Sequence, residues 1–251
     1  MNKPKTNYTS EPGKVADKDK FYSPRYAYKL LFPFIPASVR TVWECACGEN
    51  SQIERDRGSR RMLHVLSEKY DTFGTDIAEL DFLNAWQERP FDAMITNVPF
   101  SRKKEFCYRA LQYGKPWAFL LPFDLSAWLD DLIDDFDVRF VIPRTRINYL
   151  TPNLLQNIHD GELLAWGNKI TLKTIGRKYE SKAKVPPDMW ASWEDATDGN
   201  LHSYAAIDYA PPRLLAKYSA AQMTTAWACW GFDLPKQLNF VKLTPEMRLD
   251  I

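Results

Sequence analysis

The chain has 251 residues, of which 45% are apolar and 14% aromatic, so it is long enough for one large domain with an extensive core. Its 33 basic residues nearly balance 32 acidic ones, which excludes binding of nucleic acid through overall charge alone but not through a local basic face. Four cysteines and three scattered histidines lack the paired spacing of zinc sites or disulfide frameworks, so no metal is expected. Without an apolar run of roughly 18 residues or a signal peptide, the sequence predicts a soluble protein of a reducing compartment, the cytoplasm.

Two parts of the chain are expected to lie outside the regular core. Residues 1–19 are polar and contain two prolines, which predicts a flexible N-terminal arm, with a functional basic arm as the alternative. Residues 20–251 are predicted to form a single domain. Its pattern weakens over 151–222, which we interpret as an insertion that either folds on itself or recognises a nucleic-acid strand through interleaved basic and aromatic residues.

A helix is predicted to begin at Ser23 and Pro24, because serine is favoured at the N-cap and proline in the first helical turn. Apolar residues recur at helical spacing from Tyr26 to Phe34, and Pro36 ends the segment.

The first strand is predicted over 39–43 and leads into a turn of small residues, 44–50. Gly48 can adopt a positive φ there, and small side chains let the backbone approach a ligand. A helix predicted over 52–69 would begin with its positive end facing this turn. A metal site made by Cys45 and Cys47 is the weaker interpretation.

A second strand is predicted over 70–77, with Asp76 and Ile77 at its end. A carboxylate at a strand tip that follows a glycine turn suits the two hydroxyl groups of a ribose. A simple cap of a helix or loop is the alternative.

The most informative stretch is 91–100, a short apolar strand that ends at Asn97, Val98, Pro99 and Phe100. Open α/β sheets bind ligands at the carboxyl ends of their strands. An aromatic amine is a poor nucleophile, and two acceptors for its N–H groups would localise its lone pair. The side-chain oxygen of Asn97 and the backbone carbonyl of Val98 could be those acceptors, and Phe100 could stack on the base. An ordinary strand end followed by a proline turn is the alternative.

The remaining pattern predicts further elements of an α/β sheet. The predicted helices are 102–113, with Ser101 as cap and Gly114 as stop, and 126–136, which is acidic; the predicted strands are 117–121, 138–142, 169–173, 225–231 and 238–243. Three basic residues, 102–104, begin the first of these helices, where they either contact a phosphate backbone or form a solvated helix end.

The glycine turn, the acidic strand tip and the strand that ends at Asn97 follow one another along the chain. In this order they resemble the motifs of the adenine-specific DNA methyltransferases of phages and restriction systems. Residues 21–24 resemble motif X of that family, and Asn97–Phe100 resemble motif IV, with Val98 in place of the first proline. Residues 44–49 resemble motif I, with Cys45 in place of a proline, and Asn50 stands for the second glycine. Asp81 and Phe82, followed by a leucine, match motif III. The Asn-Val-Pro-Phe form is similar also to ribosomal RNA adenine dimethyltransferases.

The resemblance implies an α/β, Rossmann-like class I methyltransferase fold: a mostly parallel seven-stranded sheet with helices on both faces. It implies transfer of a methyl group from S-adenosylmethionine to the exocyclic amine of adenine in DNA, by a phage-encoded enzyme in the host cytoplasm. The implied catalytic residues are Asn97, Val98, Pro99 and Phe100. The implied cofactor-binding residues are Tyr22, Ser23, Pro24, Glu44, Cys45, Ala46, Cys47, Gly48, Asp76, Ile77, Asp81 and Phe82, with Asp81 accepting from the adenine amine of the cofactor and Phe82 lying against its ring.

Two alternatives to DNA methylation stay open at this point. The first is methylation of adenine in RNA. The second is a methyltransferase-like binding protein or subunit with impaired catalysis. In that case Cys45, Asn50 and Val98, which depart from the motifs, reflect the loss of catalytic activity. The net charge of +1 is compatible with a partner subunit or a homo-oligomer.

Overall fold

The computed structural model describes residues 21–50, 60–124, 126–147, 149 and 224–244, together with the backbone of three strands. These strands, β6 (Glu162–Trp166), β7 (Lys169–Lys173) and β8 (Ser181–Lys184), form an antiparallel sheet in the order β6-β7-β8. The strand predicted over 169–173 is therefore confirmed. The predicted arm 1–19 and most of the predicted insertion lie outside the described residues.

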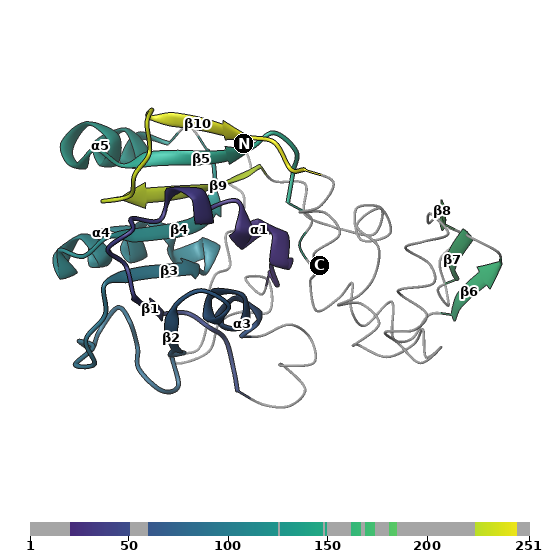
Figure 1. Cartoon of the computed structure of the whole chain (residues 1–251), viewed down its shortest axis with the longest axis horizontal. Helices are drawn as coiled ribbons and strands as arrows, with labels where there is room; N and C mark the ends of the chain where they lie inside the picture. The colour runs from purple at the N-terminus through teal and green to yellow at the C-terminus, as the bar shows by residue number, and fades with distance from the viewer. Residues whose placement is uncertain are drawn as a thin grey trace, which may run out of the picture.

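The larger sheet has seven strands in the order β10-β5-β9-β4-β3-β1-β2 (Figure 1). Their bounds are β1 Thr41–Glu44, β2 Asp71–Gly74, β3 Ala93–Asn97, β4 Trp117–Pro122, β5 Arg139–Pro143, β9 Thr225–Trp230 and β10 Leu238–Val241. Strand β9 is antiparallel to both its neighbours, and all other pairs are parallel. The predicted α/β class and mostly parallel seven-stranded sheet are confirmed, and this architecture is compatible with a Rossmann-like fold.

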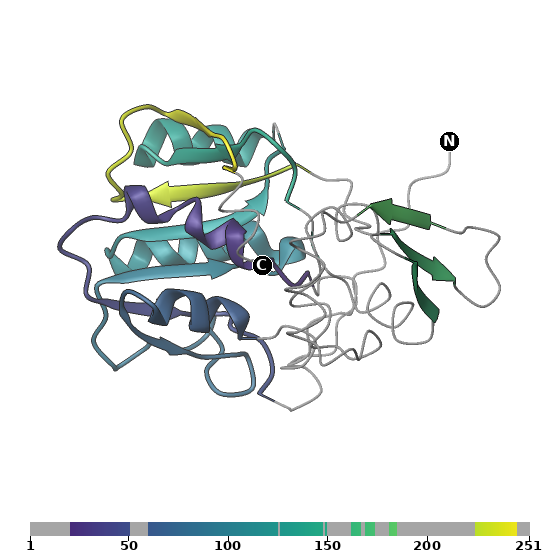
Figure 2. The same cartoon turned by 45° about the vertical axis from the view of Figure 1, so that its right-hand side comes forward.

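Helices cover both faces of this sheet (Figure 2). The helices are α1 (Arg25–Lys29), α3 (Arg61–Ser67), α4 (Lys103–Tyr113) and α5 (Ala127–Phe136), with short 3-10 turns η2 (Phe32–Phe34) and η3 (Phe100–Arg102). Buried residues of α1 and α3 share one apolar cluster with alternate strand residues such as Val42 and Ile95. Buried residues of α4 and α5 share a second cluster with the intervening residues, such as Trp43 and Met94. Since side chains alternate across a strand, the two clusters lie on opposite faces.

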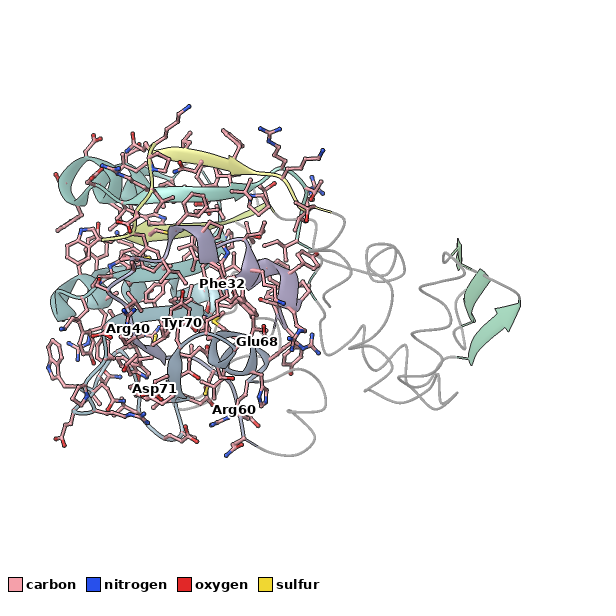
Figure 3. The ribbon with its side chains drawn as sticks, in the orientation of Figure 1. Phe32, Arg40, Arg60, Glu68, Tyr70 and Asp71 are labelled. Atoms are coloured by element: carbon pink, nitrogen blue, oxygen red, sulfur yellow. The ribbon has the colours of Figure 1, made fainter. Side chains whose placement is uncertain are left out.

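The first helix is shorter than predicted. It ends at Lys29, its N-cap is Pro24 rather than Ser23, and no side chain caps it. Pro33 explains the early end, because proline has no N–H to donate and its ring clashes with the carbonyl four residues earlier. The chain continues instead into η2, where Phe32 meets the ring of Tyr70 edge-on at a centroid distance of 6.3 Å (Figure 3).

Of the helix predicted over 52–69, residues 52–59 lie outside the described residues, and the rest contains α3. Helix α3 begins at Arg61, because Arg60 has a φ of 61° and therefore interrupts a right-handed helix. By contrast, α4 and α5 match their predictions within one residue. Gly114 ends α4 with a φ of 61° as expected for a glycine stop. Among the described helices, none combines the length and the apolarity that crossing a membrane requires.

Candidate functional site

The predicted site residues follow three neighbouring strands. Strand β1 lies between β2 and β3 and is parallel to both, with Glu44 in register with Gly74. The carboxyl ends of the three strands therefore meet at one edge of the sheet. Asp76 follows β2, the turn with Gly48 follows β1, and Asn97 ends β3. The structure thus brings these predicted residues to a common edge, which we call the carboxyl edge.

Backbone hydrogen bonds fix the turn that follows β1. The Thr75 N–H donates to the Glu44 carbonyl and the Cys47 N–H donates to the Thr75 carbonyl, both at 3.0 Å. Gly48 has a φ of 84°, the left-handed conformation predicted for it. A Cβ atom at Gly74 would lie 2.9 Å from both Cβ and Sγ of Cys47. The turn is therefore held against β2 more closely than any other residue at Gly74 would allow.

Glu44 is a buried carboxyl group at this edge. The Thr96 hydroxyl donates to its Oε1 at 2.7 Å, whereas its Oε2 has no hydrogen-bond partner within the described part of the chain. Burial raises the pKa of Glu44 to about 8; the nearby charge of Asp76 also raises it, while Thr96 and Arg60 lower it. At neutral pH the group is therefore mostly protonated, with an O–H available to a partner.

Asp76 lies beside this group and is 7% exposed. Burial is the main cause that raises the pKa of Asp76, and the charges of Glu49 and Glu79 raise it further. A backbone hydrogen bond from Ile77 lowers it. Arg60, labelled in Figure 3, is the main counter-charge, and its guanidinium bonds Glu79 at 2.6 Å. Acidic groups thus outnumber basic ones at this end of the carboxyl edge, which favours a cationic ligand with hydroxyl groups.

Asn97 has its amide fixed in one orientation. Its Nδ2 donates to the carbonyl of Phe21 at 2.8 Å, and a carbonyl can only accept, so the assignment of nitrogen and oxygen is determined. Its Oδ1 is buried and has no hydrogen-bond partner among the described residues. Buried polar atoms are rarely left in this state unless a ligand or water completes them. This oxygen is the strongest mark of a binding site in the described structure.

An aromatic group adjoins Asn97. The rings of Phe21 and Phe100 are stacked, with centroids 4.8 Å apart and an interplanar angle of 24°. Tyr149 lies beside the pair, at 5.8 Å from Phe21 and 5.9 Å from Phe100, nearly perpendicular to both. Its hydroxyl bonds the Thr225 hydroxyl at 2.8 Å, which fixes the ring. We call Phe21, Phe100 and Tyr149 the aromatic triad.

The other predicted catalytic residues shape the backbone after β3. Val98 is 2% exposed and packs in the apolar cluster beneath α4 and α5. Pro99 has a φ of −57° and is the N-cap of η3. Position 98 therefore has a buried apolar side chain, and its backbone carbonyl is one that any residue would supply.

Two residues predicted to bind the cofactor have packing roles in the structure. Phe82 is 2% exposed and stacks on Phe106 at 4.8 Å within the core. Asp81 accepts hydrogen bonds from Leu83 N–H at 3.0 Å and Asn84 Nδ2 at 2.6 Å, so it stabilises its own turn. Contacts of these two side chains with a cofactor stay predictions.

The remaining predicted cofactor residues are mostly enclosed. Tyr22, Ser23, Pro24 and Cys45 are buried, and Ala46 and Ile77 are half-buried. Burial raises the pKa of both thiols, Cys45 and Cys47, so neither is a reactive thiolate. Within the described residues, no cluster of three His, Cys, Asp or Glu side chains could hold a metal ion.

The basic group at the start of α4 is largely engaged. Lys103 pairs with Asp124 and lies over the ring of Trp128, 5.6 Å from its centroid. Arg102 pairs with Glu105 at 3.5 Å. Contact of this group with phosphate stays a prediction.

Sequence reasoning missed Thr96 and Arg60 as parts of the site. Thr96 could have been noticed as a polar residue at the end of an apolar strand, next to Asn97. Nothing in the sequence distinguishes Arg60 from its basic neighbours, because its role follows from its left-handed backbone. Comparison of the chain with family models and with curated proteins gives no match.

Proposed function

We propose that the protein transfers a methyl group from S-adenosylmethionine to the exocyclic amine of adenine in DNA. One observation carries the proposal: Oδ1 of Asn97, at the carboxyl end of β3, is buried and has no hydrogen-bond partner in the described part of the chain. The carbonyl of Phe21 holds the amide nitrogen, so the free atom is an acceptor. The exocyclic amine of adenine presents two N–H donors, which suit such an acceptor.

The mechanism follows from the needs of a weak nucleophile. Asn97 Oδ1 accepts one N–H of the amine and the Val98 carbonyl accepts the other, which draws the nitrogen toward tetrahedral geometry and localises its lone pair. Phe100 supports the base by stacking. Because a base within a duplex cannot reach a sheet edge, the adenine is flipped out of the stack. The gain in rate comes from positioning and from preorganised acceptors.

The residues at the carboxyl edge fit the proposed cofactor. The left-handed Gly48 turn keeps the backbone after β1 close to β2, and Asp76 suits the ribose hydroxyl groups. Asp76, Glu49 and Glu79 suit a ligand that carries positive charge. The protonated Glu44, whose Oε2 has no partner among the described residues, can donate a hydrogen bond to that ligand. When bound, S-adenosylmethionine would supply an electrophilic methyl group on sulfur and would leave as the neutral thioether. The methylated amine would release one proton to solvent, because the Asn97 and Val98 oxygens are too weakly basic to keep it. The α/β sheet is compatible with the Rossmann-like methyltransferase fold that this function requires.

The experiment is transfer of labelled methyl groups from S-adenosylmethionine to duplex DNA, single-stranded DNA and RNA. We expect label on adenine in DNA, and we expect Asn97→Ala to lower the rate by at least about a hundredfold, as for other preorganised polar contacts to a transition state. Gln112→Ala, which alters an exposed amide in α4, is the matched control. Label on RNA alone would replace DNA as the substrate. Cofactor binding without transfer would support the impaired binding protein, and unchanged turnover in Asn97→Ala would remove that residue from the mechanism.

A further inference from the structure

The aromatic triad contains a ring that the proposed chemistry does not use. Phe21 covers one face of Phe100 at 4.8 Å with nearly parallel rings, which is also the arrangement that a base stacked on Phe100 would have. The same residue supplies the carbonyl that holds the Asn97 amide. The Phe21 ring therefore covers Phe100, while the backbone of the same residue contacts the amide that carries the proposed acceptor.

Three sides of the space around Phe21 are defined by fixed groups. Phe100 provides a stacking face at the start of η3, and Tyr149 stands nearly perpendicular to both rings with its hydroxyl tied to Thr225. Asn97 lies at the end of β3, within hydrogen-bonding distance of the Phe21 backbone. A base in the place of the Phe21 ring would be stacked on Phe100 and bounded by Tyr149, beside the backbone that holds the Asn97 amide.

We propose that Phe21 is a placeholder for the target base: its ring occupies the stacking face of Phe100 until a flipped base displaces it. The inference rests on the proposed function, since it assumes that the ligand of Asn97 is a purine with an exocyclic amine. Only the side chain of Phe21 has to leave. Its carbonyl can stay on Asn97 Nδ2 and keep the amide oriented during the exchange.

Two hypotheses for the Phe21 ring, a placeholder that the base displaces and a permanent wall on which the base stacks, predict opposite effects of one substitution. Phe21→Ala removes the ring but keeps the backbone carbonyl. If the ring competes with the base, its removal tightens base binding by about three- to tenfold, the range expected for one aromatic pair. If the ring is instead a second wall of a base sandwich, its removal weakens binding by a similar factor. Phe100→Ala weakens binding by about tenfold in either case.

The test measures fluorescence anisotropy of a labelled oligodeoxyadenylate of about 12 nucleotides with the full chain and no cofactor. An abasic strand of equal length reports contacts with the backbone alone and is expected to bind wild type and Phe21→Ala equally. Phe34→Ala is the matched control, because Phe34 is another half-buried phenylalanine that packs against the same core cluster. Phe21→Leu keeps apolar volume without a flat ring, so it should also bind more tightly even if Phe21→Ala unfolds.

Equal or weaker binding of oligodeoxyadenylate by a folded Phe21 variant would overturn the placeholder and leave the proposed function standing. Absence of any difference between oligodeoxyadenylate and the abasic strand, in wild type and variants alike, would overturn both. Tighter binding in Phe21→Ala and Phe21→Leu, but not in Phe34→Ala, is the expected result.

Discussion

Glu44 is expected to make the stability of the protein depend on pH. Its folded-state pKa of about 8 lies well above the ordinary value of 4.5, chiefly because the group is buried. Below about pH 4.5 both the folded and the unfolded chain hold the proton, and the contribution of the group to stability is fully present. As pH rises, the unfolded chain releases the proton first, so stability falls until the pH passes about 8.

The magnitude follows from the size of the shift. One pKa unit corresponds to about 1.4 kcal/mol. The ionisation of Glu44 alone therefore lowers the free energy of unfolding by at most about 5 kcal/mol as the pH rises from about 4.5 to about 8. Glu44→Gln removes the ionisation but keeps an acceptor for the Thr96 hydroxyl. The variant should therefore lack most of this loss and become more stable than wild type at about pH 8, while the two differ little at about pH 5.

The measurement is the free energy of unfolding by urea at several pH values between about 5 and 8. Asp76 also has a raised pKa and so the same sign of dependence, and for that reason the difference between wild type and Glu44→Gln is the informative quantity. Glu88→Gln, at an exposed position, should leave the curve unchanged. Parallel curves for wild type and Glu44→Gln would refute the reasoning, since they would show that Glu44 titrates normally in the folded chain.

Two further predictions concern packing around the carboxyl edge. Gly74→Ala should lower the free energy of unfolding by about 1–3 kcal/mol, because its Cβ would lie 2.9 Å from Cys47; an unchanged urea midpoint would show that the two strand ends separate easily. Phe82→Ala should cost about 3–5 kcal/mol in the same assay, because it empties a fully enclosed space between Phe106 and its neighbours. Phe82→Leu should retain about half of that stability, and a loss below about 1 kcal/mol in the alanine variant would argue that the ring serves a ligand instead of the core.

The sheet was the most predictable part of the fold. Short apolar runs bounded by polar turns specify buried strands, and the runs that end at Glu44 and Asn97 are confirmed within two residues. Helix bounds were less predictable where one residue overrides the periodicity. Pro33 ended the first helix early, although the apolar spacing around it would continue a helix, and the left-handed Arg60 fixes the first residue of α3.

The location of the site was predictable where local backbone features, such as strand ends and turns, determine it. Gly48 and Asn97 lie where the pattern places them, because strand ends and glycine turns are local features. The orientation of the Asn97 amide was not predictable, since it depends on a carbonyl 76 residues earlier in the chain. Phe82 shows the converse: a motif match predicts contact with a ligand, whereas the surrounding aromatic rings give it a place in the core.

These contacts also explain why the carboxyl edge can hold unpartnered polar atoms. Glu44 and Thr96 join the ends of β1 and β3, while the bonds among Glu44, Thr75 and Cys47 join β1 to β2. The edge is therefore crosslinked by backbone and side-chain bonds that do not involve Glu44 Oε2 or Asn97 Oδ1. A buried polar atom without a partner costs free energy, and the neighbouring bonds oppose a rearrangement of the edge that would satisfy it. Ligand groups that donate to Asn97 Oδ1 and accept from the protonated Glu44 would recover that free energy, which is the physical reason to look for them here.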